Sequence, residues 1–276
     1  MTICRSIFLG VALLAGATGS AGAADMYGDG GSLKDGPYQM PEMARWYLRG
    51  DIGYATHRES DIRELDANGF SQPLIDTEID EAWTGGGGIG MYFGHALRGD
   101  VTYDHRADTG VTGWKENGDL PEGNRSFDVD SSVVLANLYY DIDIGTSFTP
   151  YMGFGLGWAS NRANEGTGDG FICGCVGGYP TAINVPVVIE SETTQNFAWA
   201  LMAGISIDLG GRGGMKDVQD MASAFKLDLG YRYLDMGEVN TGEVIAQHPS
   251  AQASGDPIID DYNAHEFRVG LRYDIN

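Results

Sequence analysis

The sequence predicts an all-β protein, an eight-stranded antiparallel up-and-down barrel whose strands cross a membrane. Three observations lead to this fold class. Eight segments alternate between apolar and polar residues with the period of two that is typical of β-strands. The connections between these segments are alternately short and long. The apolar faces are free of charge along the strands, whereas the polar faces combine glycines with acids and bases.

Each segment is long enough to cross a membrane, because a tilted transmembrane strand needs about 9 to 11 residues. The last one shows the alternation clearly: Phe267 and Val269 lie on one face, Glu266 and Arg268 on the other. A helical periodicity appears only weakly, at 215–222, within a connection. The eight segments are 46–58, 83–94, 97–108, 129–142, 148–161, 196–210, 223–237 and 263–276.

The connections fall into two classes. Those after the second, fourth and sixth segments are short. Those after the first, third, fifth and seventh are long: 59–82, 109–128, 162–194 and 238–262. This alternation is typical of a transmembrane barrel with short periplasmic turns and long extracellular loops.

The orientation of the two faces follows from volume. The interior of an eight-stranded barrel is just wide enough for side chains to fill it. The bulky residues of the apolar faces are too numerous to fit there, whereas glycines and paired ions fit. We therefore expect the apolar faces to contact lipid, because in water they would cause aggregation. The alternative is a secreted, lipocalin-like barrel with its apolar face inward.

The N-terminus predicts export. Residues 1–23 read as a signal peptide, with Arg5 in the positive region, an apolar run at 7–17 and a small-residue cleavage pattern ending at Ala23. Residues 24–45 read as a flexible periplasmic leader, and 46–276 as the barrel domain. No segment has the roughly 18 consecutive apolar residues of a transmembrane helix.

The charge and the cysteines limit the possible functions. The formal net charge is −22, which argues against nucleic acid as a partner, because phosphate binding requires basic patches. Cys173 and Cys175 are the only cysteines after the predicted signal peptide. A disulfide between such close neighbours would be strained, and no further metal ligands lie nearby in the sequence. We expect a loop pair without a metal, and the sequence leaves open whether the pair is reduced or oxidised.

Three stretches resemble a known family: WYLRGDIGY at 46–54, LDLGYRYLDMG at 227–237 and HEFRVGLRYDIN at 265–276. They are similar to the small outer-membrane barrels of α-proteobacteria, the opacity-protein-like surface antigens within the OmpA/OmpX-type superfamily. The resemblance implies location in the bacterial outer membrane. It also implies insertion by the barrel assembly machinery, through a C-terminal signal to which Gly270, Tyr273 and Ile275 correspond.

The candidate site is an ion-pair network inside the lumen. The polar faces supply seven bases and eight acids, which should pair because unpaired buried charges are costly. We expect Arg49, Arg268 and Arg272 to form the central cluster with Asp51, Asp100 and Glu266. The predicted network consists of Arg49, Asp51, Arg98, Asp100, Asp228, Arg232, Glu266, Arg268 and Arg272.

These features predict a largely closed barrel that supports the envelope and presents acidic loops. The four long connections contain 21 acids and 4 bases, so contact with lipopolysaccharide would need divalent cations as a bridge. A narrow porin is the alternative. A lipid A-modifying enzyme is a third, but His105, His265 and the His248-Pro249-Ser250 stretch do not form a catalytic motif. We therefore predict no enzyme activity and no cofactor, catalytic residue or metal site.

Overall fold

The computed structural model describes residues 45–57, 61–65, 71–117, 120–176, 179–209, 224–248 and 255–275. These residues belong to one compact unit, Glu42–Asn276. They contain no helix that is long and apolar enough to span a membrane. The predicted signal peptide and, apart from Arg45, the predicted leader lie outside the described residues.

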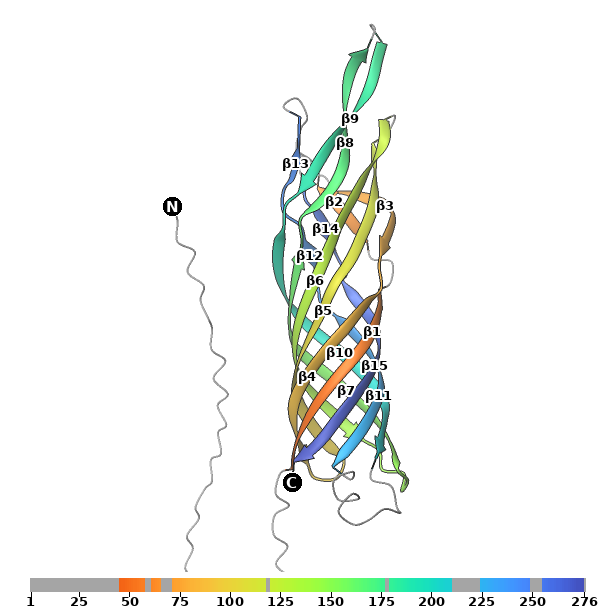
Figure 1. Ribbon diagram of the computed structural model, residues 1–276, viewed down its shortest axis with the longest axis vertical. Coiled ribbons are helices and arrows are strands. Elements are labelled where there is room, and N and C mark those ends of the chain that lie inside the picture. The colour runs from red at the N-terminus through yellow and green to blue at the C-terminus, as the bar shows by residue number, and fades with distance from the viewer. Residues whose placement is uncertain are drawn as a thin grey trace, which may run out of the picture. The chain divides into compact units, whose positions relative to one another are not determined.

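Eight strands close into an antiparallel barrel, which confirms the predicted fold class (Figure 1). The order around the wall is β1–β4–β5–β6–β7–β10–β11–β15. The barrel closes where β1 pairs with β15, from Trp46 opposite Ile275 to His57 opposite Ala264. Each strand overlaps one predicted segment, and β5 and β6 extend beyond theirs by nine residues each at the end near the long connections. The barrel strands are β1 (Trp46–His57), β4 (Ala82–Phe93), β5 (Leu97–Asn117), β6 (Leu120–Asp141), β7 (Phe148–Ala163), β10 (Glu192–Asp208), β11 (Phe225–Asp235) and β15 (Asn263–Ile275).

Side chains along the wall alternate between lumen and exterior as the sequence predicts. On β1, Ile52 is 62% exposed, whereas Asp51 beside it is 6% exposed. The exterior carries aromatic residues at both ends of the barrel, including Trp46 and Phe93 near the short turns and Trp83 and Trp158 near the long connections. Such paired aromatic bands are typical of the two membrane interfaces.

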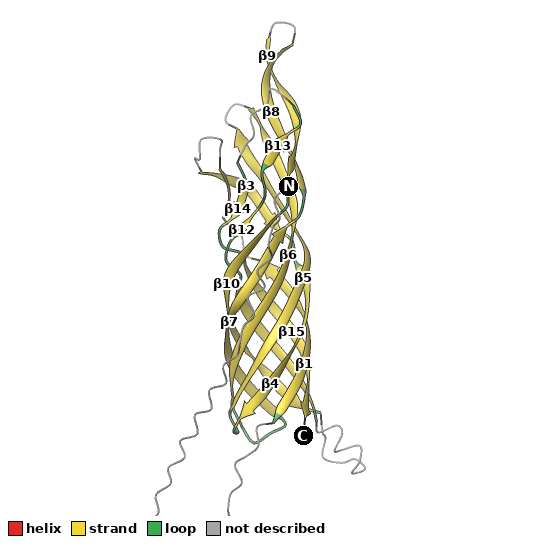
Figure 2. Cartoon of the chain, turned by 90° about the vertical axis from the view of Figure 1, so that its left-hand side faces the viewer, coloured by secondary structure: helices red, strands yellow, loops and turns green. Residues whose placement is uncertain are grey.

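The long connections differ from the predicted loops because they continue the β structure beyond the barrel (Figures 1 and 2). We use the name crown for this part of the structure. It consists of the described residues within 61–81, 107–128, 164–191 and 236–262. The β5–β6 ladder enters it through a bulge at Asp108, whose φ is +37°. The other crown strands are β2 (Ile62–Leu65), β3 (Ser71–Ile79), β8 (Gly166–Val176), β9 (Tyr179–Ile189), β12 (Val239–Asn240), β13 (Val244–Ala246) and β14 (Pro257–Ile259).

An apolar core fills the crown and the adjoining end of the barrel. Val133, Leu135 and Leu234 face the lumen from the wall, and Phe127 and Ile259 pack above them. Full burial of an aliphatic or aromatic side chain stabilises a fold by about 1.5–3 kcal/mol. The connections are therefore ordered by a core of their own, which the sequence interpretation did not anticipate.

Candidate functional site in the barrel lumen

Glycines on the lumen face make room for the charged side chains. A Cβ at Gly270 would lie 2.3 Å from Asp51 Oδ1, and one at Gly86 would lie 2.2 Å from Asp104 Oδ1. Real Cβ atoms do not approach an oxygen so closely. These two carboxylates therefore lie over the backbone of the neighbouring strands, where only glycine can be accommodated.

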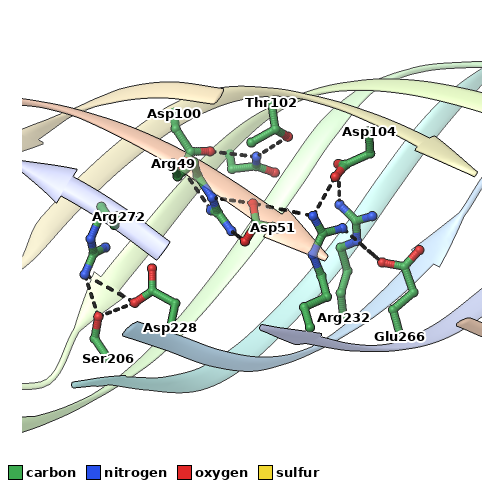
Figure 3. Close-up of polar contacts among 12 residues, drawn as sticks. Arg49, Asp51, Asp100, Thr102, Asp104, Ser206, Asp228, Arg232, Glu266 and Arg272 are labelled. Carbon is green, nitrogen blue, oxygen red and sulfur yellow. Dashed lines mark hydrogen bonds and ion pairs between the residues drawn. The ribbon is translucent and has the colours of Figure 1, made fainter. Parts of the chain in front are cut away.

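The central group of the network is built around Arg49 from β1. Its Nη2 lies 2.7 Å from Asp51 Oδ1, and its Nη1 lies 3.0 Å from Asp100 Oδ2 on β5. Arg49 Nη1 also donates to Tyr139 Oη at 2.7 Å, and Asn137 Nδ2 donates to Asp100 Oδ1 at 2.7 Å. The Asp100 carboxylate on β5 thus accepts from strands on either side of it, β1 and β6 (Figure 3).

The outer group lies beside it, toward the crown, and centres on Glu266 of β15, which is fully buried. Its carboxylate pairs with three guanidinium groups: Arg232 at 2.6 Å, Arg268 at 3.2 Å and Arg106. Asp104 accepts from two of them, Arg232 at 2.7 Å and Arg268. Because Arg268 also lies 3.6 Å from Asp51, the outer and central groups form one continuous network.

The inner group lies toward the short turns. Arg272 Nη2 lies 3.4 Å from Asp228 Oδ1, and Ser206 Oγ bonds to both side chains (Figure 3). Lys226 lies 3.3 Å from Asp274, which also accepts from Tyr92 Oη at 2.8 Å. Further ion pairs thus occupy the lumen at the end near the short turns.

Tyrosines complete this inner end. The Arg98 guanidinium pairs with Asp141 at 3.0 Å and lies 4.0 Å from the ring centre of Tyr139 and 4.8 Å from that of Tyr151. Cation–π contacts of this kind stabilise a desolvated guanidinium by about 2 kcal/mol. Tyr47 donates to Asp100 at 3.0 Å, which ties the inner end to the central group.

These side chains fill the cross-section of the lumen. A cavity of about 20 Å³ remains between Arg49, Asp228 and Arg232. This is room for about one water molecule. Beyond the outer group, the apolar core around Leu135 and Leu234 continues the filling into the crown. Chemically, the arrangement links the strands of the wall to one another through ion pairs and hydrogen bonds inside the lumen.

All nine residues of the predicted network face the lumen, and each makes at least one of these ion pairs. Of the expected central cluster, Arg49, Asp51 and Asp100 form the central group, and Arg268 and Glu266 lie in the outer group that joins it. Arg272 belongs to the inner group with Asp228. Asp104 and Arg106 are not among the nine residues of the predicted network, although both pair with its members.

The lumen tyrosines Tyr47, Tyr92, Tyr139 and Tyr151 were not anticipated. Bulky residues were expected to face lipid because an eight-stranded lumen has little room. These four tyrosines instead lie on the polar faces of their strands. Tyr47 and Tyr139 each stand two residues from a charged lumen residue, Arg49 and Asp141, and Tyr92 and Tyr151 each stand two residues from a lumen-face glycine, Gly90 and Gly153. This even spacing was the signal that could have placed them.

A second buried ion cluster lies in the crown. Glu64 of β2 is fully buried and pairs with Lys115 of β5 at 2.7 Å and with Arg125 of β6 at 2.8 Å. Arg125 also donates to the carbonyl oxygen of Asp169 on β8 at 2.8 Å. This cluster ties three of the four connections together, and it falls in residues that were predicted to be loops.

The remaining candidate residues are dispersed. His105 and His265 face outward near the crown, with Nδ1 3.1 Å from Ser132 Oγ and 2.5 Å from Tyr231 Oη respectively. His248 is exposed, and Pro249 and Ser250 lie outside the described residues. The backbones of Cys173 and Cys175 belong to β8, but their side chains lie outside the description. No group of three or more His, Cys, Asp or Glu in the described part of the chain is arranged to hold a metal.

Comparison with known proteins gives a family and a set of relatives. The outer membrane protein beta-barrel domain matches residues 10–274. Uncharacterized proteins of Brucella abortus and Brucella suis are each 31% identical over 272 residues, covering 86% of this chain and 87% of theirs. Neisserial surface protein A is 16% identical with a TM-score of 0.42, covering 84% of this chain and 99% of its own. OprG of Pseudomonas aeruginosa is 14% identical with a TM-score of 0.44, covering 83% and 96%.

Proposed function

Since the chain belongs to the outer membrane protein beta-barrel family and lies in the bacterial outer membrane, we propose that it is a structural, surface-exposed barrel with a closed lumen. It contributes to the integrity of the envelope and presents its crown outside the cell. The ion-pair network holds the strands in register from within, and the apolar core fastens the crown to the barrel.

The observation that carries this proposal is the continuous filling of the lumen. A solute passing through would have to displace the ion pairs of Arg49 and Glu266 and then the apolar core around Leu135. Separating buried charges without new partners costs several kcal/mol per ion. Passive diffusion through such a lumen is therefore blocked.

Conductance in planar lipid bilayers tests the closed lumen. The purified protein should insert, as shown by heat-modifiable gel migration, and give no reproducible single-channel steps. The alternative is a narrow porin, which the small water-sized cavity between Arg49 and Arg232 favours. Reproducible steps that scale with salt concentration would replace the structural proposal with the porin.

The crown also supports contact with lipopolysaccharide through divalent cations. The four long connections 59–82, 109–128, 162–194 and 238–262 carry 21 acids against 4 bases. Direct contact with lipid phosphates is therefore repulsive, and carboxylates are suitable ligands for Ca²⁺ or Mg²⁺. In the absence of a metal-binding group among the described residues, such bridging is diffuse. Calcium should raise the thermal stability of the protein in lipopolysaccharide but not in phosphatidylcholine. An equal response in both lipids would contradict the bridging. The formal net charge of −22 also argues against nucleic acid as a partner.

Assembly by the outer-membrane barrel machinery rests on the C-terminal strand. Tyr273 and Ile275 face outward on β15 and pair with β1 at the closing seam. Replacing Ile275 by Asp should lower the yield of heat-modifiable protein in the outer membrane, because the charge would face lipid and the signal would be altered. The same substitution at exposed Ile245 of the crown should leave the yield unchanged.

We also propose that the protein is not an enzyme. The nearest approach to a catalytic pair is His105 with Ser132, on the exterior of β5 and β6. Both residues lie directly opposite one another in a continuous ladder, so the adjoining backbone N–H groups are used in strand pairing and cannot stabilise an oxyanion. Mass spectrometry of lipid A and phospholipids should show no difference between cells with wild-type protein and cells with Ser132→Ala.

A further inference from the structure

The hairpin of β8 and β9 differs from the rest of the crown in charge and position. Residues 166–189 contain one charged residue, Asp169, in a chain of which 20% is charged. Beyond Gly168 the hairpin leaves the other crown strands and projects farther from the barrel than they do (Figures 1 and 2). It is therefore a β-ribbon with a single charged residue at the outermost end of an acidic protein.

One edge of this ribbon has no partner strand in the described part of the chain. β8 pairs with β6 only at Thr167 and Gly168, and with β9 along its whole length. From Asp169 to Val176 its other edge is open. An open edge presents unpaired N–H and C=O groups, which are a template for an added strand.

The direction of the backbone groups follows from the prolines of β9. Pro186 lies opposite Asp169, and Pro180 lies opposite Cys175. Proline has no N–H and is tolerated where that position points away from the neighbouring strand. The carbonyl oxygen of Asp169 accepts from Arg125, on the side away from β9. Because the pattern repeats every second residue, Phe171, Cys173 and Cys175 direct their N–H and C=O groups to the open edge.

The opposite edge of the ribbon is protected. β13 pairs with β9 at 187–189, and Gln247 N donates to the carbonyl oxygen of Pro186 at 3.0 Å. Farther out, Pro180 removes a donor from this edge. Proline and bound neighbours are common means of preventing edge pairing. β8 has no proline and no charged residue between Gly170 and Val176. The edge of β8, unlike that of β9, is therefore available for a partner strand.

We propose that this edge of β8 pairs antiparallel with the same edge of a second copy of the chain, held in an apposed membrane. β8 runs outward from the barrel, so copies in one membrane would bring two β8 strands together in parallel. Copies facing each other across two membranes bring them together antiparallel, in the slightly more stable arrangement, and a two-fold axis closes the contact.

Charge is compatible with this self-pairing. If the two-fold axis passes beside Cys173, the two Asp169 side chains lie at opposite ends of the paired segment, eight residue steps apart. At about 3.3 Å per residue this is roughly 26 Å, well beyond the Debye length of about 8 Å at physiological ionic strength. The acidic crowns behind the hairpins are farther apart still.

Clustering of proteoliposomes tests the proposal. The full chain is reconstituted into phosphatidylcholine vesicles carrying either of two dyes, with EDTA to remove divalent cations and a reductant to prevent disulfides. Light scattering and dye co-localisation should show clustering only when both vesicle populations carry the protein. Clustering with protein in one population would show a contact with lipid instead and overturn the proposal, as would no clustering at all.

Paired proline substitutions then identify the edge. Cys173→Pro removes an N–H from the open edge in both copies, whereas Ala182→Pro, directly opposite in the ladder, removes one from the protected edge. We expect Cys173→Pro to reduce clustering to that of protein-free vesicles and Ala182→Pro to leave it unchanged. Ile172→Asp places two like charges close together at the centre of the paired segment, so this variant should also abolish clustering. It tests the same contact without introducing a proline. Equal behaviour of the two proline variants, or clustering by Ile172→Asp, would contradict the edge assignment.

Discussion

Replacing Glu266 by Gln removes the charge on which three arginines converge. The side chain is fully buried and accepts from Arg106, Arg232 and Arg268. Glutamine keeps the volume but presents an amide N–H₂ to guanidinium donors. Arg232 and Arg268 then keep Asp104 and Asp51 as carboxylate partners, whereas Arg106 loses its pair with Glu266. Removing one partner of a buried ion pair costs about 3–5 kcal/mol, and we expect a loss of that size.

Urea unfolding in lipid vesicles measures this loss, with gel migration reporting the folded fraction. With a slope of about 1–3 kcal/mol per M urea, a loss of about 3–5 kcal/mol lowers the midpoint by roughly 1–5 M. The control is Asp260→Asn in the crown. Asp260 also forms an ion pair with an arginine, Arg63, but about a third of each of these two side chains is exposed. Such a pair contributes about 0–1 kcal/mol. Equal small effects of the two variants would refute the view that the lumen network stabilises the barrel.

The remaining predictions use the same unfolding assay. Gly157→Ala should destabilise the barrel, because its Cβ would lie 1.9 Å from a backbone oxygen of Val134, whereas Gly85→Ala meets nothing within 4 Å and should be neutral. Leu135→Ala, in the buried core, should cost about 2–5 kcal/mol. Burial and then three nearby glutamates raise the pKa of the Asp256 carboxyl, so the folded state binds its proton more tightly. Wild-type stability should therefore fall as pH rises from the usual aspartate value through this raised pKa, and Asp256→Asn should lack that fall.

The barrel could be predicted because its signal is local and repeated. Alternation at Ile52 or Val269 fixes which face a residue occupies, and the volume of an eight-stranded interior then decides which face is outside. The pairing of strands follows from the short turns. Gly94, with φ of +83° in the turn between β4 and β5, is an example of a residue type that marks such a turn.

The partners within the lumen could not be read from the sequence in the same way. Whether Arg272 reaches Asp228 or Asp51 depends on the stagger of the strands around the barrel, which alternation does not determine. Arg49 and Arg272 lie opposite one another on β1 and β15, yet their guanidinium groups point to different acids. Rotamers and the room left by glycines decide between such choices.

The crown was missed for a different reason. Its strands are short or irregular, and their apolar residues pack against several connections at once. Ile62, Phe127 and Ile259 become buried only when three separate connections meet. Glu64 appeared as one acid in an acid-rich stretch, and only its long-range partners Lys115 and Arg125 make it a buried ion-pair residue.

The apolar side chains of the barrel wall face lipid, and the quenching of a single tryptophan by brominated lipid tests this orientation most directly. Trp158 is 66% exposed on the exterior of β7. A variant that keeps Trp158 and carries phenylalanine at the other four tryptophan positions should fold into vesicles of brominated phosphatidylcholine with strongly quenched fluorescence. Unchanged fluorescence in the brominated lipid would place this side chain away from the acyl chains and contradict the apolar exterior.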